Sequence, residues 1–98
     1  MIEETMEPIY IGSIVVSRCG RDKDVVFAVV GTVESENGKT FALISDGRFH
    51  TLEQPKKKNP IHLQTMCSAS PRILAAMEEG SLNNRRLFKI LGETQHQA

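Results

Sequence analysis

Basic residues are the side chains of this 98-residue sequence that could do the most definite chemistry. They fall in four short groups, at positions 18–23, 48–50, 56–58 and 85–86. Clustered bases neutralise phosphates and position a protein on a nucleic acid, whereas base sequence is read by stacking or base-edge contacts. A solvated surface explains each base about as well when it is taken singly. The candidate phosphate-binding residues are Arg18, Arg21, Lys23, Arg48, His50, Lys56, Lys57, Lys58, Arg85 and Arg86.

The charge is unevenly distributed, although twelve bases balance twelve acids. Residues 1–9 carry three glutamates and no base, which predicts an acidic N-terminal arm. Residues 10–67 carry eight bases and six acids, and residues 68–98 carry four bases and three acids. The arm therefore masks a mildly basic remainder, and net charge alone gives no case for a nucleic-acid partner.

Residues that could bind a metal or perform catalysis are sparse. The cysteines and the two central histidines are not spaced like a zinc pair, and the sequence has no CxxC motif. No nucleophile–base–orienter triplet and no phosphate-binding glycine loop can be found. We therefore expect no metal, no cofactor and no enzymatic activity. The potential ligands weighed for a metal are Cys19, Cys67, His50 and His62.

Cysteine content and the N-terminal composition indicate a compartment. Cys19 and Cys67 could make one disulfide at most, which is weak stabilisation for a small secreted domain. The N-terminus has acids where a signal peptide needs bases, and no apolar run reaches membrane length. We expect a cytoplasmic protein with free thiols and no membrane contact.

Short strands and turns are predicted from Tyr10 to about residue 63, where they would position the first three basic groups. Strands are expected at 13–17, 25–33, 40–45 and 48–53, with a short closing strand at 61–63. Two dipeptides, at 37–38 and 46–47, predict type I′ hairpin turns because Asn, Asp and Gly accept positive φ. The apolar run at 25–33 is either covered on both faces or bent at Gly31. Strands at this spacing predict an antiparallel meander that a small barrel would close.

Two helices are predicted after the strands. Ser70 and Pro71 form an N-cap and first helical position, and Gly80 is placed to end that helix. Asn83 is expected to cap a second helix that ends at Gly92, with residues 93–98 as a flexible tail. A shared apolar face should pack onto the strands or onto a partner; it consists of Leu87, Phe88 and Leu91.

Arg85 and Arg86 stand in the first turn of the second predicted helix, where bases oppose the helix dipole at a cost of about 0.3–1 kcal/mol each. Pairing with Glu78 and Glu79 across the Gly80 turn would explain them. A second phosphate contact is the alternative.

The segment from Gly12 to Asp24 carries a family resemblance. It has a glycine, a β-branched strand, a basic turn containing Gly20 and a return into an apolar run, which resembles the KOW motif. The stretches GRDKD, SDGRFHTLEQPKKK and IHLQT look like a group of bacterial KOW proteins, as does the ending NNRRLFKIL. That group is similar to a KOW-bearing large-subunit ribosomal protein of archaea and eukaryotes. The resemblance covers roughly residues 10–92.

The resemblance implies a mainly β fold: a small SH3-like barrel over residues 10–66, followed by a helical extension of two short helices over 67–92. It also implies binding to structured RNA through the barrel's loops, with the ribosome, translation and a ribosomal protein partner as the setting. Asp24 departs from the pattern, which has glycine after the loop lysine and so suits a turn of unusual φ. Exposed aromatics are scarce, so we expect backbone recognition with little base reading. The only candidates in the barrel are Tyr10 and Phe49.

Two functions from different classes remain open at this point. The first is a non-catalytic RNA-binding accessory protein that contacts the phosphate backbone through the basic loop and the lysine run. The second is a protein-interaction module that uses the same barrel for a peptide or for self-association. SH3-like barrels serve both roles, so fold alone does not separate them. Neutral net charge and Asp24 favour the second, while the basic groups and the resemblance favour the first.

Overall fold

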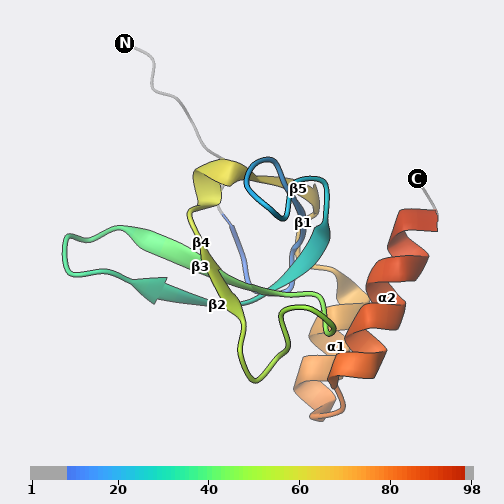
Figure 1. The fold of residues 1–98 in the computed structure, drawn as a ribbon. Helices are drawn as coiled ribbons and strands as arrows, with labels where there is room; N and C mark the ends of the chain where they lie inside the picture. The colour runs from blue at the N-terminus through green and yellow to red at the C-terminus, as the bar shows by residue number, and fades with distance from the viewer. Residues whose placement is uncertain (1–8, 97–98) are drawn as a thin grey trace.

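The computed structural model describes residues 9–96 and shows a mainly β chain followed by two helices (Figure 1). Its strands form one antiparallel sheet in the order β4-β3-β2-β1-β5. The acidic arm predicted for residues 1–9 lies outside the described residues, apart from Ile9. The elements are β1 (Ile14–Ser17), β2 (Val26–Glu34), β3 (Thr40–Ser45), β4 (Lys56–Lys58), the 3₁₀ helix η1 (Pro60–His62), β5 (Leu63–Cys67), α1 (Pro71–Glu79) and α2 (Asn84–His96).

The first half of strand β2, residues 26–29, is buried on both faces, as its apolar sequence predicts, while its last three residues are exposed. Successive side chains of a strand point to opposite faces, so Val26 and Ala28 enter one core while Phe27 and Val29 enter another. The pairing register with β3 shifts between Val29 and Gly31, which agrees with the alternative of a bend near Gly31, although β2 remains in one sheet.

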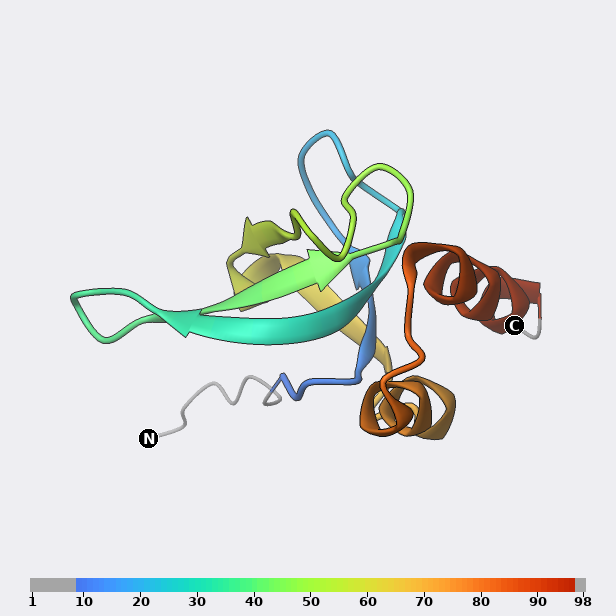
Figure 2. The same cartoon turned by 90° about the horizontal axis from the view of Figure 1, so that it is seen from below.

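Two hydrophobic cores therefore lie on the two sides of the sheet. One is formed with the helices, which Figure 2 shows together on one side of the strands. The other lies against the opposite face and is made of strand residues alone. The helix-side core contains Ile14, Val26, Ala28, Ile73, Leu87, Ile90 and Leu91, and the strand-only core contains Val15, Phe27, Val29, Ala42 and Ile44.

The β2–β3 hairpin is present, but its turn differs from the predicted type. Gly38 has φ 84°, whereas Asn37 does not have positive φ; among the described non-glycine residues only Asp24 and Ala69 do. A type I′ turn needs positive φ at both central residues, so this connection is a different turn that ends on a glycine. The amide of Gly38 donates to the carbonyl of Ser35 at 3.0 Å.

The strand predicted at 48–53 is wrong. Residues 46–55 form a loop instead, because the buried carboxylate of Asp46 accepts the backbone amides of Arg48, Phe49 and His50 at 2.9–3.0 Å. These are the donors that a strand would have paired with its neighbour. The next strand is the lysine run itself, β4, which pairs with β3 at the edge of the sheet. An edge position is compatible with the prolines nearby, and exposed lysine there disfavours pairing with another chain.

The predicted closing strand lies later than expected. Residues 60–62 form η1, and strand β5 (63–67) then pairs antiparallel with β1. The 3₁₀ turn is capped by Asn59, whose side-chain oxygen accepts the amide of Ile61 at 3.2 Å.

The helical ends follow the predicted caps at three of four positions. Pro71 begins α1, Gly80 ends it with φ 71°, and the side chain of Asn83 accepts the amide of Arg86 at 2.8 Å at the start of α2. The predicted stop at Gly92 is wrong, since α2 continues to His96. Residues 93–96 are therefore helical, and 97–98 lie outside the described residues. Within the described residues, no helix is long and apolar enough to cross a membrane.

Packing of the tail is confirmed for two of its three predicted contacts. Leu87 and Leu91 are buried in the core between α2 and the sheet, together with Ile90. Phe88 was expected to share their face, but its side chain is 46 % exposed.

Candidate nucleic-acid interface

The turn that joins β1 to β2, residues 18–24, carries the first basic group. Its backbone is closed by hydrogen bonds from Lys23 N to Gly20 O at 3.2 Å and from Asp24 N to Ser17 O at 2.8 Å. Asp24 takes φ 71°, a conformation that glycine adopts freely and aspartate adopts at some cost. This is the position where the KOW pattern has glycine. The backbone therefore has the unusual φ expected there, while the side chain adds an acid to the turn.

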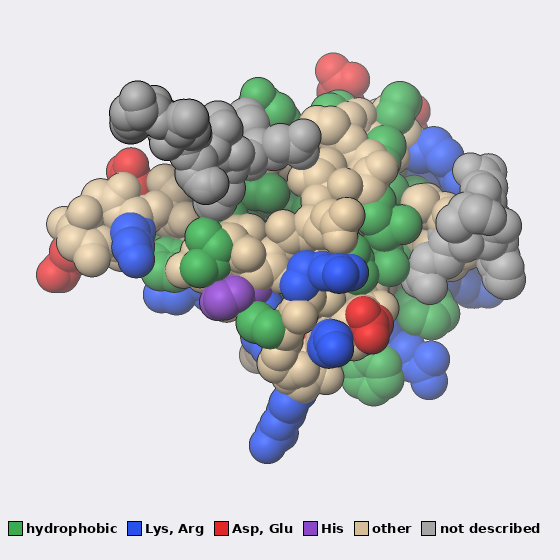
Figure 3. Space-filling view, turned by 90° about the horizontal axis from the view of Figure 1, so that it is seen from above, with side chains coloured by type: hydrophobic (Ala, Val, Ile, Leu, Met, Phe, Trp, Pro, Cys, Tyr) green, Lys and Arg blue, Asp and Glu red, His purple; other side chains and the backbone are tan. Residues whose placement is uncertain are grey.

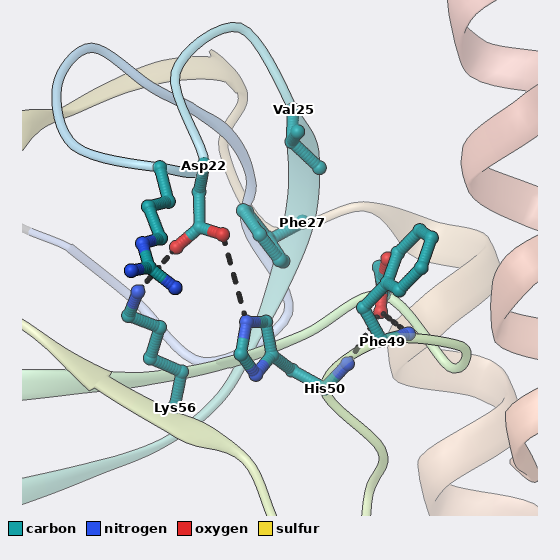
Figure 4. Close-up of a pocket in the computed structure, with 8 residues that line it drawn as sticks. Asp22, Val25, Phe27, Phe49, His50 and Lys56 are labelled. Carbon is teal, nitrogen blue, oxygen red and sulfur yellow. Dashed lines mark hydrogen bonds and ion pairs between the residues drawn. The ribbon is translucent and has the colours of Figure 1, made fainter.

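A second acid of this turn, Asp22, points inward and is neutralised. Its carboxylate forms an ion pair and hydrogen bond with Lys56 of β4, and lies 3.6 Å from Nε2 of His50 (Figure 4). The Asp22 side chain is only 14 % exposed. Burial by itself would raise the pKa of Asp22, but the hydrogen bond and charge of Lys56, helped by His50, lower it below its ordinary value.

A second contact from β4 also holds the turn. Lys58 is buried, and its ammonium donates to the carbonyl oxygen of Cys19 at 3.1 Å. The hydroxyl of Ser17 donates to the same carbonyl at 3.1 Å. The turn is therefore fixed at two points by the lysine run rather than projecting freely.

The bases left on the outside of the turn are Arg18, Arg21 and Lys23, and all three are exposed. Figure 3 shows Lys and Arg side chains gathered over this turn, one projecting well clear of the surface, with an acidic side chain among them. Because Asp22 is turned inward, the exposed charged residues of the turn are three bases and one acid, Asp24.

The predicted lysine run divides into different roles. Lys56 and Lys58 hold the β1–β2 turn, as described above. Lys57 points to the other face of β4, is exposed, and lies 4.9 Å from the ring centroid of Phe41. Of the three lysines, only Lys57 is therefore placed to meet a phosphate without giving up an ion pair or hydrogen bond within the described residues.

The side chains of the 46–55 loop do not alternate as those of the predicted strand would. Alternation along the strand predicted at 48–53 would turn Phe49 inward between Arg48 and His50, but Arg48 and Phe49 are both exposed, Phe49 by 75 %. The His50 ring lies 5.9 Å from that of Phe27, at the end of the strand-only core. The cause is again Asp46. Its hydrogen bonds hold the segment in a loop, so its side chains do not point alternately to two faces as they would in a strand.

Arg48 joins this loop to α2. Its guanidinium carbon lies 5.3 Å from the ring centroid of Phe49 and 5.5 Å from that of Phe88. Arginine over aromatic faces is a stabilising cation–π arrangement. It leaves two exposed aromatic rings beside an exposed base.

Arg85 and Arg86 form a separate basic group on the first turn of α2. Among the described residues no ion pair joins them to Glu78 or Glu79, so the predicted pairing is wrong. Arg86 instead donates to the hydroxyl of Ser81 at 2.7 Å, and that hydroxyl contacts Glu79 at 3.2 Å. Both arginines are exposed and line one surface hollow with Arg72 and Lys89.

Sequence reasoning missed the two inward-facing acids that organise this surface. By sequence, Asp22 is only a neighbour of the bases and Asp46 only a turn residue. The one signal for Asp46 is its type, since aspartate commonly accepts amides of the residues that follow it. No local signal indicates that Asp22 meets Lys56, which lies 34 residues away.

Neither a metal-ligand group nor similarity to a known protein assigns a function to this chain. No group of three or more potential metal ligands is found among residues 9–96, and Cys19 and Cys67 are not bridged to each other. The sequence matches no protein-family model, and no curated protein matches it either. A functional assignment therefore depends on the chain's own residues.

Proposed function

We propose that this chain is a non-catalytic RNA-binding protein that contacts the phosphate backbone through its β1–β2 turn. The observation that carries the proposal is the inward turn of Asp22, which removes one negative charge from a surface that keeps three exposed bases. A turn fixed at both Asp22 and Cys19 presents those bases without a large ordering cost on binding.

The fold supports an SH3-like barrel of the KOW type. Five antiparallel strands in the order β4-β3-β2-β1-β5 form one sheet, and one of its two cores is built from strand residues alone. A 3₁₀ turn between β4 and β5 redirects the chain from one edge of the sheet to the other. Asp24 with φ 71° agrees with the glycine of the KOW pattern at that position.

Lys57 and Arg48 extend the proposed contact beyond the turn. Both are exposed, and each lies against an aromatic ring that limits its freedom. The resemblance to KOW proteins suggests structured RNA of the ribosome as the partner, and the cytoplasm as the compartment. Arg85 and Arg86, which lie in a separate surface hollow on α2, are not part of this proposed contact.

The proposal is tested by recovering RNA with the tagged full chain from cells. The variant removes the exposed bases of the turn, with the three changes Arg18→Gln, Arg21→Gln and Lys23→Gln. A charge-matched control removes three bases elsewhere on the surface, with Lys39→Gln, Arg72→Gln and Lys89→Gln. Wild type and control should retain the same RNA, and the turn variant should lose most of it. Equal recovery by all three proteins would reject the turn as the contact.

A protein-interaction function is the second candidate, and Phe49 is the observation that favours it. Exposed phenylalanine beside arginine is typical of protein interfaces. If no RNA is recovered with wild type, and a protein partner is lost on Phe49→Ala but kept in the turn variant, the second function replaces the first.

A further inference from the structure

A pocket of about 510 Å³ opens between the β1–β2 turn and the 46–55 loop. Figure 2 shows these two loops on the same side of the molecule, and Figure 4 shows the side chains that line the space between them. The wall is aromatic and aliphatic, and charged groups stand around it. The lining residues are Arg21, Asp22, Val25, Phe27, Asp46, Phe49, His50 and Lys56.

Both acids of this pocket are already occupied. The carboxylate of Asp22 is paired with Lys56 and faces His50. Asp46 is 5 % exposed, and one of its oxygens accepts three backbone amides. Neither carboxylate therefore opposes an incoming phosphate as a free charge would. Arg21 is exposed at the pocket and has no ion-pair partner among the described residues.

The aromatic members offer a surface on which a flat ring can stack. Phe49 is 75 % exposed, and the guanidinium of Arg48 over it restricts how its ring can turn. His50 lies deeper, 5.9 Å from Phe27, with its side chain 30 % exposed. RNA-binding proteins recognise unpaired bases by stacking them on phenylalanine, histidine or arginine, because every base has a flat apolar face.

We propose that this pocket accepts one unpaired nucleotide of the bound RNA, its base against Phe49 and its phosphate at Arg21. The proposal rests on the proposed RNA-binding function and adds a substrate class to it: RNA with a bulged or looped-out nucleotide next to a paired stem. The stem meets the bases of the β1–β2 turn, and the pocket selects stems that carry an unpaired residue.

The test compares two RNA hairpins that differ at one position. The first carries a single bulged 2-aminopurine, and the second is the same stem without the bulge. Wild type should bind the bulged hairpin about 5- to 150-fold more tightly, the range expected for stacking of one base. The fluorescence of the 2-aminopurine should change on binding, because stacking alters its emission.

Phe49→Leu is the diagnostic variant, because leucine keeps an apolar side chain and removes the aromatic face. It should lose the preference for the bulge and keep wild-type affinity for the paired stem. Tyr10→Leu is the matched control: Tyr10 is also an exposed aromatic, but it does not line the pocket. This control should retain the preference.

The outcomes separate the two proposals. Equal binding of both hairpins by wild type, or a bulge preference that survives Phe49→Leu, overturns the nucleotide pocket and leaves RNA binding by the turn intact. Failure of wild type to bind either hairpin overturns both the pocket and the proposed function.

Discussion

Three aspartates in the two loops differ in what their carboxylates contact. Asp22 is paired with Lys56, Asp46 accepts three amides of its own loop, and Asp24 is exposed in a positive-φ conformation. Two of the three therefore organise the loops from inside. Only Asp24 adds negative charge to the surface that we propose for RNA.

The inward pairing of Asp22 makes stability depend on pH in a predictable direction. Because the folded-state pKa of Asp22 lies below its unfolded value near 3.9, its ionised form contributes stability above about pH 4. That contribution is lost as the pH falls through the folded-state pKa. Denaturant unfolding of wild type and Asp22→Asn from pH 7 to pH 2 should show wild type more stable at neutral pH, with the difference shrinking below about pH 4.

The difference between the unfolding free energies of the two proteins separates the contribution of Asp22 from that of the other carboxyl groups. Glu53 and Glu93 also have a lowered pKa, the first mainly through a hydrogen bond from Asn84 and the second mainly through one from Arg72. These residues are present in both proteins and cancel in the comparison. A difference in unfolding free energy that stays constant with pH would contradict the Asp22–Lys56 pairing.

Gly47 is a second position where one residue controls a contact between elements. It has φ 77°, and a Cβ atom there would overlap the carbonyl oxygen of Asn84 at the start of α2. Gly47→Ala should destabilise the fold by about 2 kcal/mol or more, from backbone strain and from displacement of the helix. Gly38→Ala is the control, since Gly38 has φ 84° but no atom lies within 4 Å of the position that a Cβ would take there.

The control should cost only the strain, about 1 kcal/mol. Both values come from urea unfolding curves of the two variants and wild type. Equal losses at the two glycines would mean that the 46–55 loop does not pack tightly on α2.

At the scale of elements, local chemistry was enough to predict most strands and helix ends. The strands predicted at 13–17 and 40–45, the helix start at Pro71, the helix stop at Gly80 and the cap at Asn83 agree with the structure, whereas the predicted cap Ser70 makes no side-chain capping hydrogen bond. These features depend on neighbours within about four residues. The dipeptide at 37–38 likewise predicted the hairpin between β2 and β3.

Where contacts between distant segments determine the structure, the sequence alone was not sufficient to predict it. The segment 48–53 alternates like a strand, but Asp46 and the hydrogen bond from Leu52 N to Asn84 Oδ1 hold it as a loop. Gly92 looks like a helix stop, yet Ile90 and Leu91 are held against the sheet, and α2 continues past it. The same limit applies to the site, because the pairing of Asp22 with Lys56 joins two distant segments.

The packing of α2 gives a test at this scale. Leu87 is fully buried in the helix-side core, so Leu87→Ala should lower the unfolding free energy by about 2–5 kcal/mol. Phe88→Ala, one residue further along the helix, should cost about 1 kcal/mol, because Phe88 is 46 % exposed and loses mainly its contact with Arg48. Thermal unfolding followed by circular dichroism measures both. A larger loss at Phe88 than at Leu87 would mean that α2 is rotated and turns Phe88 toward the sheet.

At the scale of the whole molecule, the proposed RNA surface consists of exposed side chains on two loops, and one of them, the 46–55 loop, also contacts α2. Helices α1 and α2 lie on one side of the strands, while the β1–β2 turn and the 46–55 loop project together on another side, where the 46–55 loop lies next to the start of α2 (Figure 2). The interface can therefore be altered at exposed residues without opening either core. Because the altered side chains are exposed, binding experiments on loop variants are interpretable.

The salt dependence of RNA binding tests the central claim most directly. Each phosphate contact that is lost reduces the slope of log K against log salt by roughly one. Binding of a structured RNA should be measured at several salt concentrations for wild type, the turn variant (Arg18→Gln, Arg21→Gln and Lys23→Gln together) and Asp24→Gly. Glycine suits φ 71°, so the last change removes a negative charge without disturbing the turn.

The account predicts that the turn variant binds more weakly with a slope flatter by about two to three, and that Asp24→Gly binds more tightly than wild type with a steeper slope. The charge-matched control with changes at Lys39, Arg72 and Lys89 should keep a slope close to that of wild type. Slopes that are the same for wild type, the turn variant and Asp24→Gly would contradict an RNA-binding role for the β1–β2 turn.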